Sequence, residues 1–521
     1  MVPTLGVILT TIVVATFIIW ALKLLNWLWF KPRKMEKLLR EQGLNGNPYR
    51  PFLGDLKDLI RVKNATQQRS IKLMSDDTLQ HIFTYFHQTV TKYGQNSFIW
   101  YGPRPRLNVV DPELIKEILN KPDVFHKPLP EIGKILAGGG ILFLEGQKWA
   151  KRRKIINPAF HHEKLKNMVP AIGLSCSNMM DKLKCMVSSN NEGWCEIDIW
   201  PYLEDLTGDV ISRTAFGSSH EEGRRIFHLQ REKVKLTMQL LQLSFIPGWR
   251  YLPTKTNRKV KAITNELHYL LRGIIDNRQK AMGRGEAIPG DDLLGILMES
   301  NSKFIQEYGN KNAGMSTEDV IEECKLFYFA GSETTSSLLV WTMVLLGQHP
   351  EWQTRAREEV MRVFGNSEPS FEGLNQLKTV TMILQEVLRL FPPAPLIVRG
   401  STETVKLGNL TIPRGVHLTL LIGLLHYDPK IWGDDAKEFK PQRFSAGVSN
   451  ATSLQSSFIP FSSGPRVCIG QNFAMIEAKI ALAMILKSFS FELSPSYLHS
   501  PSIVLTLQPQ FGAPIILRSL E

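Results

Sequence analysis

An apolar segment without a single charge lies at the start of the chain. It runs for 18 residues, from Leu5 to Leu22, and holds only apolar residues and threonine. Lys23 interrupts the pattern, and Trp27 and Trp29 follow it. At 1.5 Å per residue, about 20 apolar residues span a bilayer, while lysine and tryptophan suit its interfaces. We therefore predict a transmembrane anchor helix over residues 1–30.

A cleaved signal peptide is the alternative for this segment. Signal peptides carry basic residues before the apolar run and a small-residue cleavage site after it, and this sequence shows neither. The basic residues follow the span instead: Lys31, Arg33, Lys34, Lys37 and Arg40. The positive-inside rule then leaves the rest of the chain in the cytosol, as a single-pass protein.

The remaining chain reads as one large domain behind a short linker. Two prolines stand close together in Asn47-Pro48-Tyr49-Arg50-Pro51, where a helix cannot continue. We therefore predict a basic, proline-containing linker over 31–54 and one domain over 55–521. The chain has 521 residues with a hydrophobic content of 43%, ample for a large core, and shows no internal repeat.

The net charge of +13 limits the partners. No zinc-finger spacing or RNA-binding motif accompanies it, so nucleic acid is not expected. An anionic membrane surface and an acidic protein fit the charge better. The five cysteines are scattered and odd in number, which excludes a secreted disulfide framework.

Helical periodicity dominates the sequence, so the expected fold is mainly α with a small β-sheet region. The expected helices are Asp111–Asn120, Trp149–Ile156, Arg225–Leu243, Asn257–Met282, Ser316–Gln348, Glu351–Phe364, Thr379–Leu390 and Gln471–Phe489. The expected strands are Phe98–Tyr101, Leu107–Val110, Thr404–Leu407, Val416–Leu421 and Ile503–Leu507. Ser316 and Asp319 have capping-box spacing and start the longest helix, which is apolar on most faces and should be buried.

One cysteine stands in a loop that favours its thiolate form. Cys468 lies between Gly464 and Gly470, with Phe461 and Arg466 before it. The two glycines permit a tight loop whose backbone N–H groups turn toward the sulfur. The helix that follows points its positive end there as well, and both effects lower a thiol pKa.

This segment matches the haem-binding signature Phe-x-x-Gly-x-Arg-x-Cys-x-Gly, and the chain resembles the plant microsomal cytochrome P-450 family. The resemblance implies the cytochrome P-450 fold and heme b with Cys468 as axial thiolate ligand of the iron. It also implies a place in the endoplasmic reticulum membrane and electrons from an NADPH-cytochrome reductase. A thiolate ligand pushes electron density onto the iron, which favours O–O cleavage.

A second motif has a structural meaning. Glu386 and Arg389 share a helix face at i, i+3, and apolar neighbours predict that the pair is buried. A buried pair needs further partners, and Arg443 is the expected third member. The order resembles the family's Glu-x-x-Arg helix and later Pro-x-Arg-Phe segment, which implies a lock around the haem loop.

A third motif, Ala330 to Thr335, lies in the longest helix. Taken alone, Gly331 could be a packing site and Thr334 could bond back to a helix carbonyl. The family resemblance implies instead that Gly331 lets the helix open for O2. It also implies that Glu333 and Thr334 deliver protons through water during oxygen activation.

The last group of candidate site residues is mostly cationic. The family resemblance implies that Trp149 and Arg153 contact a haem propionate, and that Arg399 and Arg466 take two further propionate-binding positions. Arginine grips carboxylates bidentately, so the residue type fits. Three more basic residues should face outward on the cysteine side and steer an acidic reductase: Lys151, Arg152 and Lys154.

The sequence constrains the substrate less than it constrains the cofactor. Four stretches resemble the plant branch that includes secologanin synthase and pentacyclic triterpene oxidases: Trp29–Pro32, Asp209–Gly217, Lys325–Gly331 and Leu505–Gly512. The expected pocket residues are nearly all apolar: Ile141, Leu142, Phe143, Phe327, Phe329, Ala330, Pro395, Leu396, Ile397 and Leu507. An apolar pocket favours hydroxylation of an oleanane-type triterpenoid over oxidation of an iridoid or secoiridoid glucoside, although Glu131 or Gln508 could bind hydroxyls.

Two other classes of function stay open at this point. A haem-thiolate isomerase or dehydratase acts on peroxides without O2 and can dispense with an acid–alcohol pair. A non-catalytic haem carrier or sensor would not need the oxygen-activating residues, which are all present here. Dependence of turnover on NADPH and O2 separates these classes.

Overall fold

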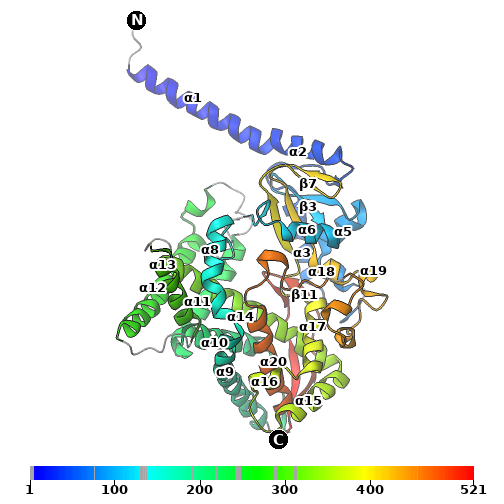
Figure 1. Cartoon of the computed structure of the whole chain (residues 1–521). Helices are drawn as coiled ribbons and strands as arrows, with labels where there is room; N and C mark the ends of the chain where they lie inside the picture. Colours follow the sequence, from blue (N-terminus) through cyan, green and yellow to red (C-terminus); the bar gives the residue numbers. More distant parts are fainter. Residues whose placement is uncertain are drawn as a thin grey trace. The chain divides into compact units, whose positions relative to one another are not determined.

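A computed structural model of the chain describes residues 5–75, 77–128, 133, 135, 138–190, 192–217, 220–240, 248–284, 292–309, 314–454 and 456–520. The chain folds into two compact units (Figure 1). Unit 1 contains residues 1–68, 83–128 and 397–421, and unit 2 contains 69–82, 129–396 and 422–521. Each unit is described by itself.

The N-terminal helix is the most apolar part of unit 1. Helix α1 (Leu5–Leu25) continues through a π-helical turn, Asn26–Phe30, into α2 (Lys31–Arg40), so the first part of the predicted linker is helical. The side chains of α1 are exposed, with Phe17 74% and Trp20 70% accessible. The continuous helix from Gly6 to Arg40 is long and apolar enough to cross a membrane, and lipid would cover these side chains.

The segment after this helix packs against unit 1. The Tyr49 hydroxyl donates to the backbone oxygen of Leu28 at 2.7 Å. The indole N–H of Trp100 donates to the Asn47 carbonyl at 3.0 Å, and Arg50 pairs with buried Asp55 at 2.8 Å. These bonds fix the direction in which the chain leaves the anchor.

A six-stranded sheet forms the centre of unit 1, in the order β1-β2-β3-β9-β6-β4. Its strands are β1 (Asn45–Gly46), β2 (Ser97–Tyr101), β3 (Arg104–Val109), β4 (Phe125–His126), β6 (Ile397–Ser401) and β9 (His417–Leu420). Strand β9 runs parallel to β3, with Leu107 opposite Leu418, and antiparallel to β6. The remaining elements are α3 (Leu56–Gln67), α5 (Thr84–Tyr93), α6 (Pro112–Asn120) and the hairpin β7 (Val405–Leu407) with β8 (Leu410–Ile412).

Unit 2 is mostly helical (Figure 1). Its longer helices are α8 (Gly146–Ile156), α9 (His162–Ser188), α10 (Trp200–Phe216), α11 (His220–Gln239), α12 (Lys255–Gly283), α13 (Leu293–Tyr308), α14 (Thr317–Gln348), α15 (Pro350–Phe364), α17 (Lys378–Leu390) and α20 (Gln471–Ser488). Its short helices are α4 (Thr78–Ile82), α16 (Phe371–Leu374), α18 (Ile422–His426), α19 (Pro429–Trp432) and the 3-10 turns Asn157–Phe160, Trp249–Tyr251, Pro441–Phe444, Val448–Asn450 and Gly464–Arg466.

Helix α14 lies at the centre of unit 2 and is in contact with α10, α17 and α20. The predicted capping box is confirmed: the Ser316 hydroxyl accepts from the Asp319 N–H, and Asp319 accepts from the Ser316 N–H. Most residues of α14 are buried, as its apolar character predicted. The helix therefore positions its few polar side chains inside the protein.

Short strands complete unit 2. A three-stranded sheet has the order β10-β13-β5, formed by β5 (Trp194–Asp198), β10 (Phe489–Leu493) and β13 (Pro514–Ser519). A separate hairpin joins β11 (Pro501–Ile503) to β12 (Leu507–Pro509). The predicted single strand Ile503–Leu507 is wrong, because the chain turns there: the Val504 N–H donates to the Thr506 oxygen at 3.1 Å.

Candidate active site

Cys468 lies exposed in a tight loop, three residues before α20 begins. The Cys468 N–H donates to the Phe461 oxygen at 3.0 Å, which closes the loop. Two residues of the loop take the left-handed conformation, Gly464 with φ +69° and Ser462 with φ +63°. Only glycine adopts that conformation without strain. The loop thus presents the sulfur near the positive end of a helix.

Arg153 of α8 lies beside this loop. Its guanidinium donates to the Val467 oxygen at 3.0 Å, one residue before the cysteine. Burial lowers the pKa of Arg153, and the negative charge of a Cys468 thiolate raises it. The interaction is reciprocal, so a guanidinium at this position favours the thiolate over the thiol.

Arg466 and Trp149 are also brought together at the loop. The Arg466 guanidinium lies over the Trp149 ring, 4.2 Å from its centroid, and donates to the Leu144 oxygen at 2.7 Å. It also forms an ion pair with Glu145. This side chain therefore binds a carboxylate, which is the chemical group of a haem propionate. Sequence reasoning missed Glu145, which shows no motif of its own.

Arg399 is buried on β6 of unit 1, where its guanidinium donates to the Val398 oxygen at 3.0 Å. The residues described above belong to unit 2. The contact of Arg399 with a propionate therefore stays a prediction.

Arg152 does not face outward, so that expectation is wrong. The residue is 8% exposed and pairs with Glu323 at 2.9 Å and Asp319 at 2.7 Å, both on α14. Glu323 also accepts from the Ile141 N–H at 3.0 Å. Burial raises the pKa of Glu323 to about 7, although Ile141 and Arg152 favour its ionised form. A basic sequence run cannot reveal acids that lie 170 residues away.

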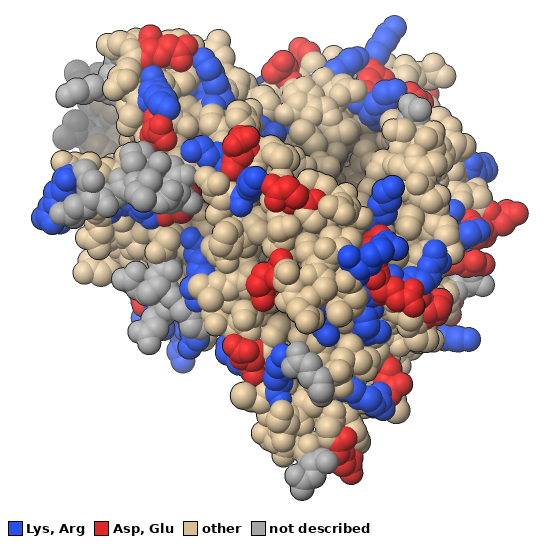
Figure 2. Space-filling model, turned by 60° about the horizontal axis from the view of Figure 1, so that its bottom comes forward, with Lys and Arg blue, Asp and Glu red and all other residues tan. Residues whose placement is uncertain are grey.

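The surface charge is mixed. Lys154 is exposed and pairs with Glu307 of α13 at 3.3 Å. On the face drawn in Figure 2, basic and acidic residues are interspersed. The net positive charge is therefore not gathered into one uniform patch on that face.

The Glu-x-x-Arg prediction is confirmed. Glu386 and Arg389 are both 0% exposed, and two bonds of 2.7 and 2.8 Å join them. Arg443 lies 3.6 Å from Glu386 and is the third member, while Asp435 accepts from Arg443 at 2.9 Å. Arg389 also donates to the carbonyls of His426 and Glu438. Every charge in this cluster has a partner, as burial requires.

Gly331 and Thr334 make local contacts in α14. A methyl group on Gly331 would meet Ile211 Cδ1 of α10 at 2.3 Å, so the glycine permits close packing of the two helices. The Thr334 hydroxyl donates to the Ala330 oxygen at 2.7 Å. These are the packing and back-bonding roles that the sequence left open, and the roles in oxygen chemistry stay predictions.

Part of the middle of α14 is accessible to solvent. Ala330 is exposed although residues 323–328 and 335–346 of the same helix are buried. Among the expected pocket residues of unit 2, Ile141, Phe327, Pro395 and Leu507 are buried. Glu131 lies outside the described residues.

Glu333 faces the C-terminal hairpin. Its carboxylate accepts from the Thr506 hydroxyl at 3.1 Å and from the Gln508 amide. Burial raises the pKa of Glu333. The Gln508 amide is therefore already engaged in a hydrogen bond within the protein.

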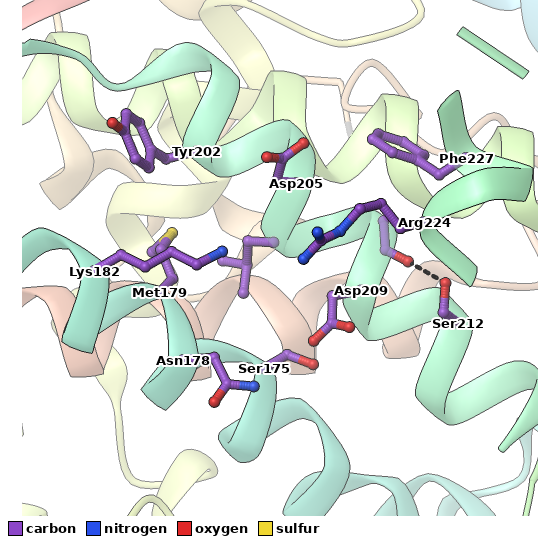
Figure 3. A pocket seen from close by; sticks show the side chains of 12 residues that line it. Ser175, Asn178, Met179, Lys182, Tyr202, Asp205, Asp209, Ser212, Arg224 and Phe227 are labelled. Carbon is purple, nitrogen blue, oxygen red and sulfur yellow. Dashed lines mark hydrogen bonds between the residues drawn. The ribbon is translucent and has the colours of Figure 1, made fainter. Parts of the chain in front are cut away.

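A separate small cavity of about 90 Å³ lies between α9, α10 and α11 (Figure 3). Polar and apolar side chains line it, and Arg224 extends toward the space between Asp205 and Asp209. Pockets for drug-sized ligands measure about 300–1,000 Å³. This cavity is too small for a terpenoid and is not the site at Cys468.

Comparison with known proteins identifies the family. The family model described as cytochrome P450 matches residues 70–510. The chain belongs to the cytochrome P450 family. It is 55% identical to cytochrome P450 CYP72A219 of Panax ginseng over 509 residues, which covers 98% of this chain and 97% of the relative.

Two further relatives support the same placement. Cytochrome P450 72A397 of Kalopanax septemlobus is 55% identical over 96% of each chain. The 11-oxo-beta-amyrin 30-oxidase of Glycyrrhiza uralensis is 51% identical over 98% of each chain. This cytochrome P450 is thus a haem-thiolate monooxygenase of the plant CYP72 clade.

The residues at Cys468 fit the haem that the family implies. The cysteine is exposed, while Cys176 and Cys324 are buried. A guanidinium and a helix N-terminus favour its thiolate form. Arg466 donates to the carboxylate of Glu145, the kind of group that a propionate would present. The predicted fold, mainly α with small sheets and an apolar N-terminal helix, is confirmed.

Proposed function

We propose that this cytochrome P450 inserts oxygen from O2 into an apolar plant terpenoid, most specifically by hydroxylating an oleanane-type triterpenoid. The exposed Cys468 beside Arg153 and Arg466 supports the haem site. The observation that carries the substrate class is the apolar character of the expected pocket residues of unit 2, of which Ile141, Phe327 and Leu507 are buried while Ala330 is exposed.

Each residue of the site has a definite task in this proposal. Cys468 holds the iron, and Arg153 keeps its sulfur ionised. Trp149 and Arg466 would hold a haem propionate, and Arg399 is a further candidate for binding a propionate. Phe461 closes the loop through its backbone oxygen. The haem, when bound, supplies the binding and reductive activation of O2.

Glu333 and Thr334 supply protons. An acid with a raised pKa remains protonated at a higher pH and can act as a general acid. The Thr334 hydroxyl is a donor and an acceptor, so it can pass a proton onward while it keeps its place on α14. Glu333 would then be reprotonated from solvent through the polar side chains around it.

The substrate proposal rests on chemistry and on one relative. The Glycyrrhiza relative is named as an oxidase of 11-oxo-beta-amyrin, a triterpenoid. An iridoid glucoside would need several hydroxyl-bonding side chains, and Gln508 already donates to Glu333 and Thr506. The named relative and the bonds of Gln508 support the proposal of a triterpenoid.

Partners and location follow from the family. A reductase supplies electrons from NADPH, and the exposed basic side chains of α8, such as Lys148 and Lys154, are candidates for its contact. The apolar N-terminal helix supports a membrane anchor, and the basic residues after it support a cytosolic catalytic part at the endoplasmic reticulum membrane.

Turnover by microsomes that contain the chain and its reductase tests this proposal. An oleanane triterpenoid and an iridoid glucoside are offered side by side, with and without NADPH. We expect a mass gain of one oxygen on the triterpenoid that requires both NADPH and O2. Oxidation of the glucoside alone would contradict the substrate proposal, and product without O2 would contradict the monooxygenase.

A further inference from the structure

The C-terminal hairpin β11–β12 is bonded to α14 through its backbone. The Leu507 oxygen accepts from the Ser337 hydroxyl at 2.7 Å and from the Trp341 indole N–H at 2.8 Å. The Leu507 N–H donates to the Pro393 oxygen at 3.1 Å. All four residues are buried. The hairpin tip therefore has a fixed position against the central helix.

Thr506 and Gln508 flank Leu507, and their polar side chains lie on the opposite face of the chain from the Leu507 side chain. Residues two apart on an extended chain share a face, and here Thr506 and Gln508 both reach Glu333 of α14. Their hydroxyl and amide donate to the same carboxylate oxygen, Oε1. The Gln508 amide also donates to the Thr506 hydroxyl at 3.0 Å. The three side chains form a closed triangle.

Charged residues of two other helices surround this triangle. Arg231 of α11 lowers the pKa of Glu333 and forms an ion pair with Glu204 of α10. Burial raises the pKa of Glu204 to about 7, and the charge of Glu333 adds to that rise. The hairpin contributes only neutral donors. Burial therefore raises the pKa of Glu333, while one cation and two hydrogen bonds lower it.

We propose that Thr506 and Gln508 are positioning residues for Glu333, which hold its carboxyl group on the hairpin and so fix where the acid stands during oxygen activation. This inference rests on the proposed role of Glu333 as the proton donor. Neither Thr506 nor Gln508 belongs to the acid–alcohol pair. Its two polar side chains act through Glu333.

The hydrogen bonds have a measurable consequence. Both donors favour the ionised carboxylate, so they lower a pKa that burial raises. Removal of one donor should raise the pKa of Glu333 by about one unit, the size expected for a hydrogen bond to a charged group. A general acid works below its pKa. The alkaline limb of coupled turnover should therefore move to higher pH.

Infrared titration of the holoenzyme tests the proposal directly. The carboxyl stretch of Glu333 is the band that Glu333→Gln abolishes. Thr506→Val removes a donor without a change of shape, and Thr506→Ser keeps the donor. Gln508→Leu removes the amide, and Gln510→Leu is its control at an exposed position of the same segment.

We expect the titration midpoint to rise by about one pH unit in Thr506→Val and Gln508→Leu and to stay in place in both controls. The alkaline limb of product formed per NADPH should move with it. An unchanged midpoint in Thr506→Val, which keeps the shape of the hairpin, would overturn the positioning role. Fully coupled turnover by Glu333→Gln would instead overturn the proposed proton donor, whatever the titration shows.

Discussion

Thr334 can be a helix-packing residue or a proton relay, and one substitution separates the two roles. Its hydroxyl donates to the Ala330 oxygen at 2.7 Å, a bond that contributes little to stability. Thr334→Ala should therefore leave the thermal unfolding midpoint nearly unchanged. General acid–base groups contribute about 100-fold or more, so we expect product per NADPH to fall at least about 10-fold while hydrogen peroxide accumulates.

Thr334→Ser is the matched control, because it keeps the hydroxyl. It should restore coupling to near the wild-type level. Tightly coupled turnover by Thr334→Ala would leave only the packing role.

The buried trio Glu386–Arg389–Arg443 should behave as a structural unit. Removal of one partner of a fully buried pair leaves an uncompensated charge and costs about 3–5 kcal/mol. We expect Arg389→Ala to lower the free energy of unfolding by that amount, measured by urea denaturation. The exposed pair of Lys303 and Glu299 is the comparison, and Lys303→Ala should cost less than about 1 kcal/mol. Similar losses in both variants would contradict the structural role of the trio.

At the scale of elements, His426 couples helix α18 to two neighbours and makes them sensitive to acid. Its Nδ1 donates to the Arg389 oxygen at 3.2 Å, and its Nε2 accepts from the Ile459 N–H at 3.2 Å. The ring must therefore be neutral, because a second proton would face the Ile459 N–H. Burial and the Arg389 charge lower the pKa of His426 to about 3.

The sign of the pH effect follows from this lowered pKa. Unfolded histidine takes up a proton below about pH 6.5 and the buried ring does not. Its contribution to stability is therefore present above pH 6.5 and is lost as the pH falls toward 3, by about 1.4 kcal/mol per pH unit. In urea titrations, His426→Gln should flatten this dependence, while His161→Gln, at an exposed position, should not. An equally steep loss in both variants would place the acid sensitivity elsewhere.

Elements with a clear apolar period could be predicted from the sequence, and the others could not. All eight expected helices are present, some with shifted ends, and residues 241–243 lie outside the described part. Helix α10 was missed because nearly every residue from Leu203 to Phe216 is buried, including Asp209 and Ser212, so no polar face marks it. Helix α9 was missed because it contains Pro170, which reads as a helix breaker.

At the scale of the whole molecule, the active site could likewise be predicted only in part from the sequence. Local motifs located Cys468, Arg466 and the Glu386–Arg389 pair. Their partners come from distant segments and carry no signal of their own, as Glu145 shows. Arg152 was misplaced for this reason, since its acids lie on α14.

Membrane orientation is a property of the whole chain and can be tested by glycosylation. Three asparagines stand in Asn-x-Thr sequences: Asn64, Asn409 and Asn450. All three are exposed, so burial would not protect them from modification. We expect none to carry a glycan in plant cells, because a cytosolic domain never meets the glycosylation machinery.

A glycosylation sequence added before Leu5 is the control and should be modified. A glycan on any of the three natural sites would show that the domain faces the lumen.

The central claim is that Cys468 supplies the thiolate ligand of the haem, and the carbon monoxide spectrum of the reduced protein tests it most directly. We predict that the wild-type chain gives the red-shifted absorption of a thiolate-bound haem. Cys185→Ala, at an exposed cysteine of α9, should keep that absorption, and Cys468→Ala should lose it. Survival of the red-shifted absorption in Cys468→Ala would contradict the account.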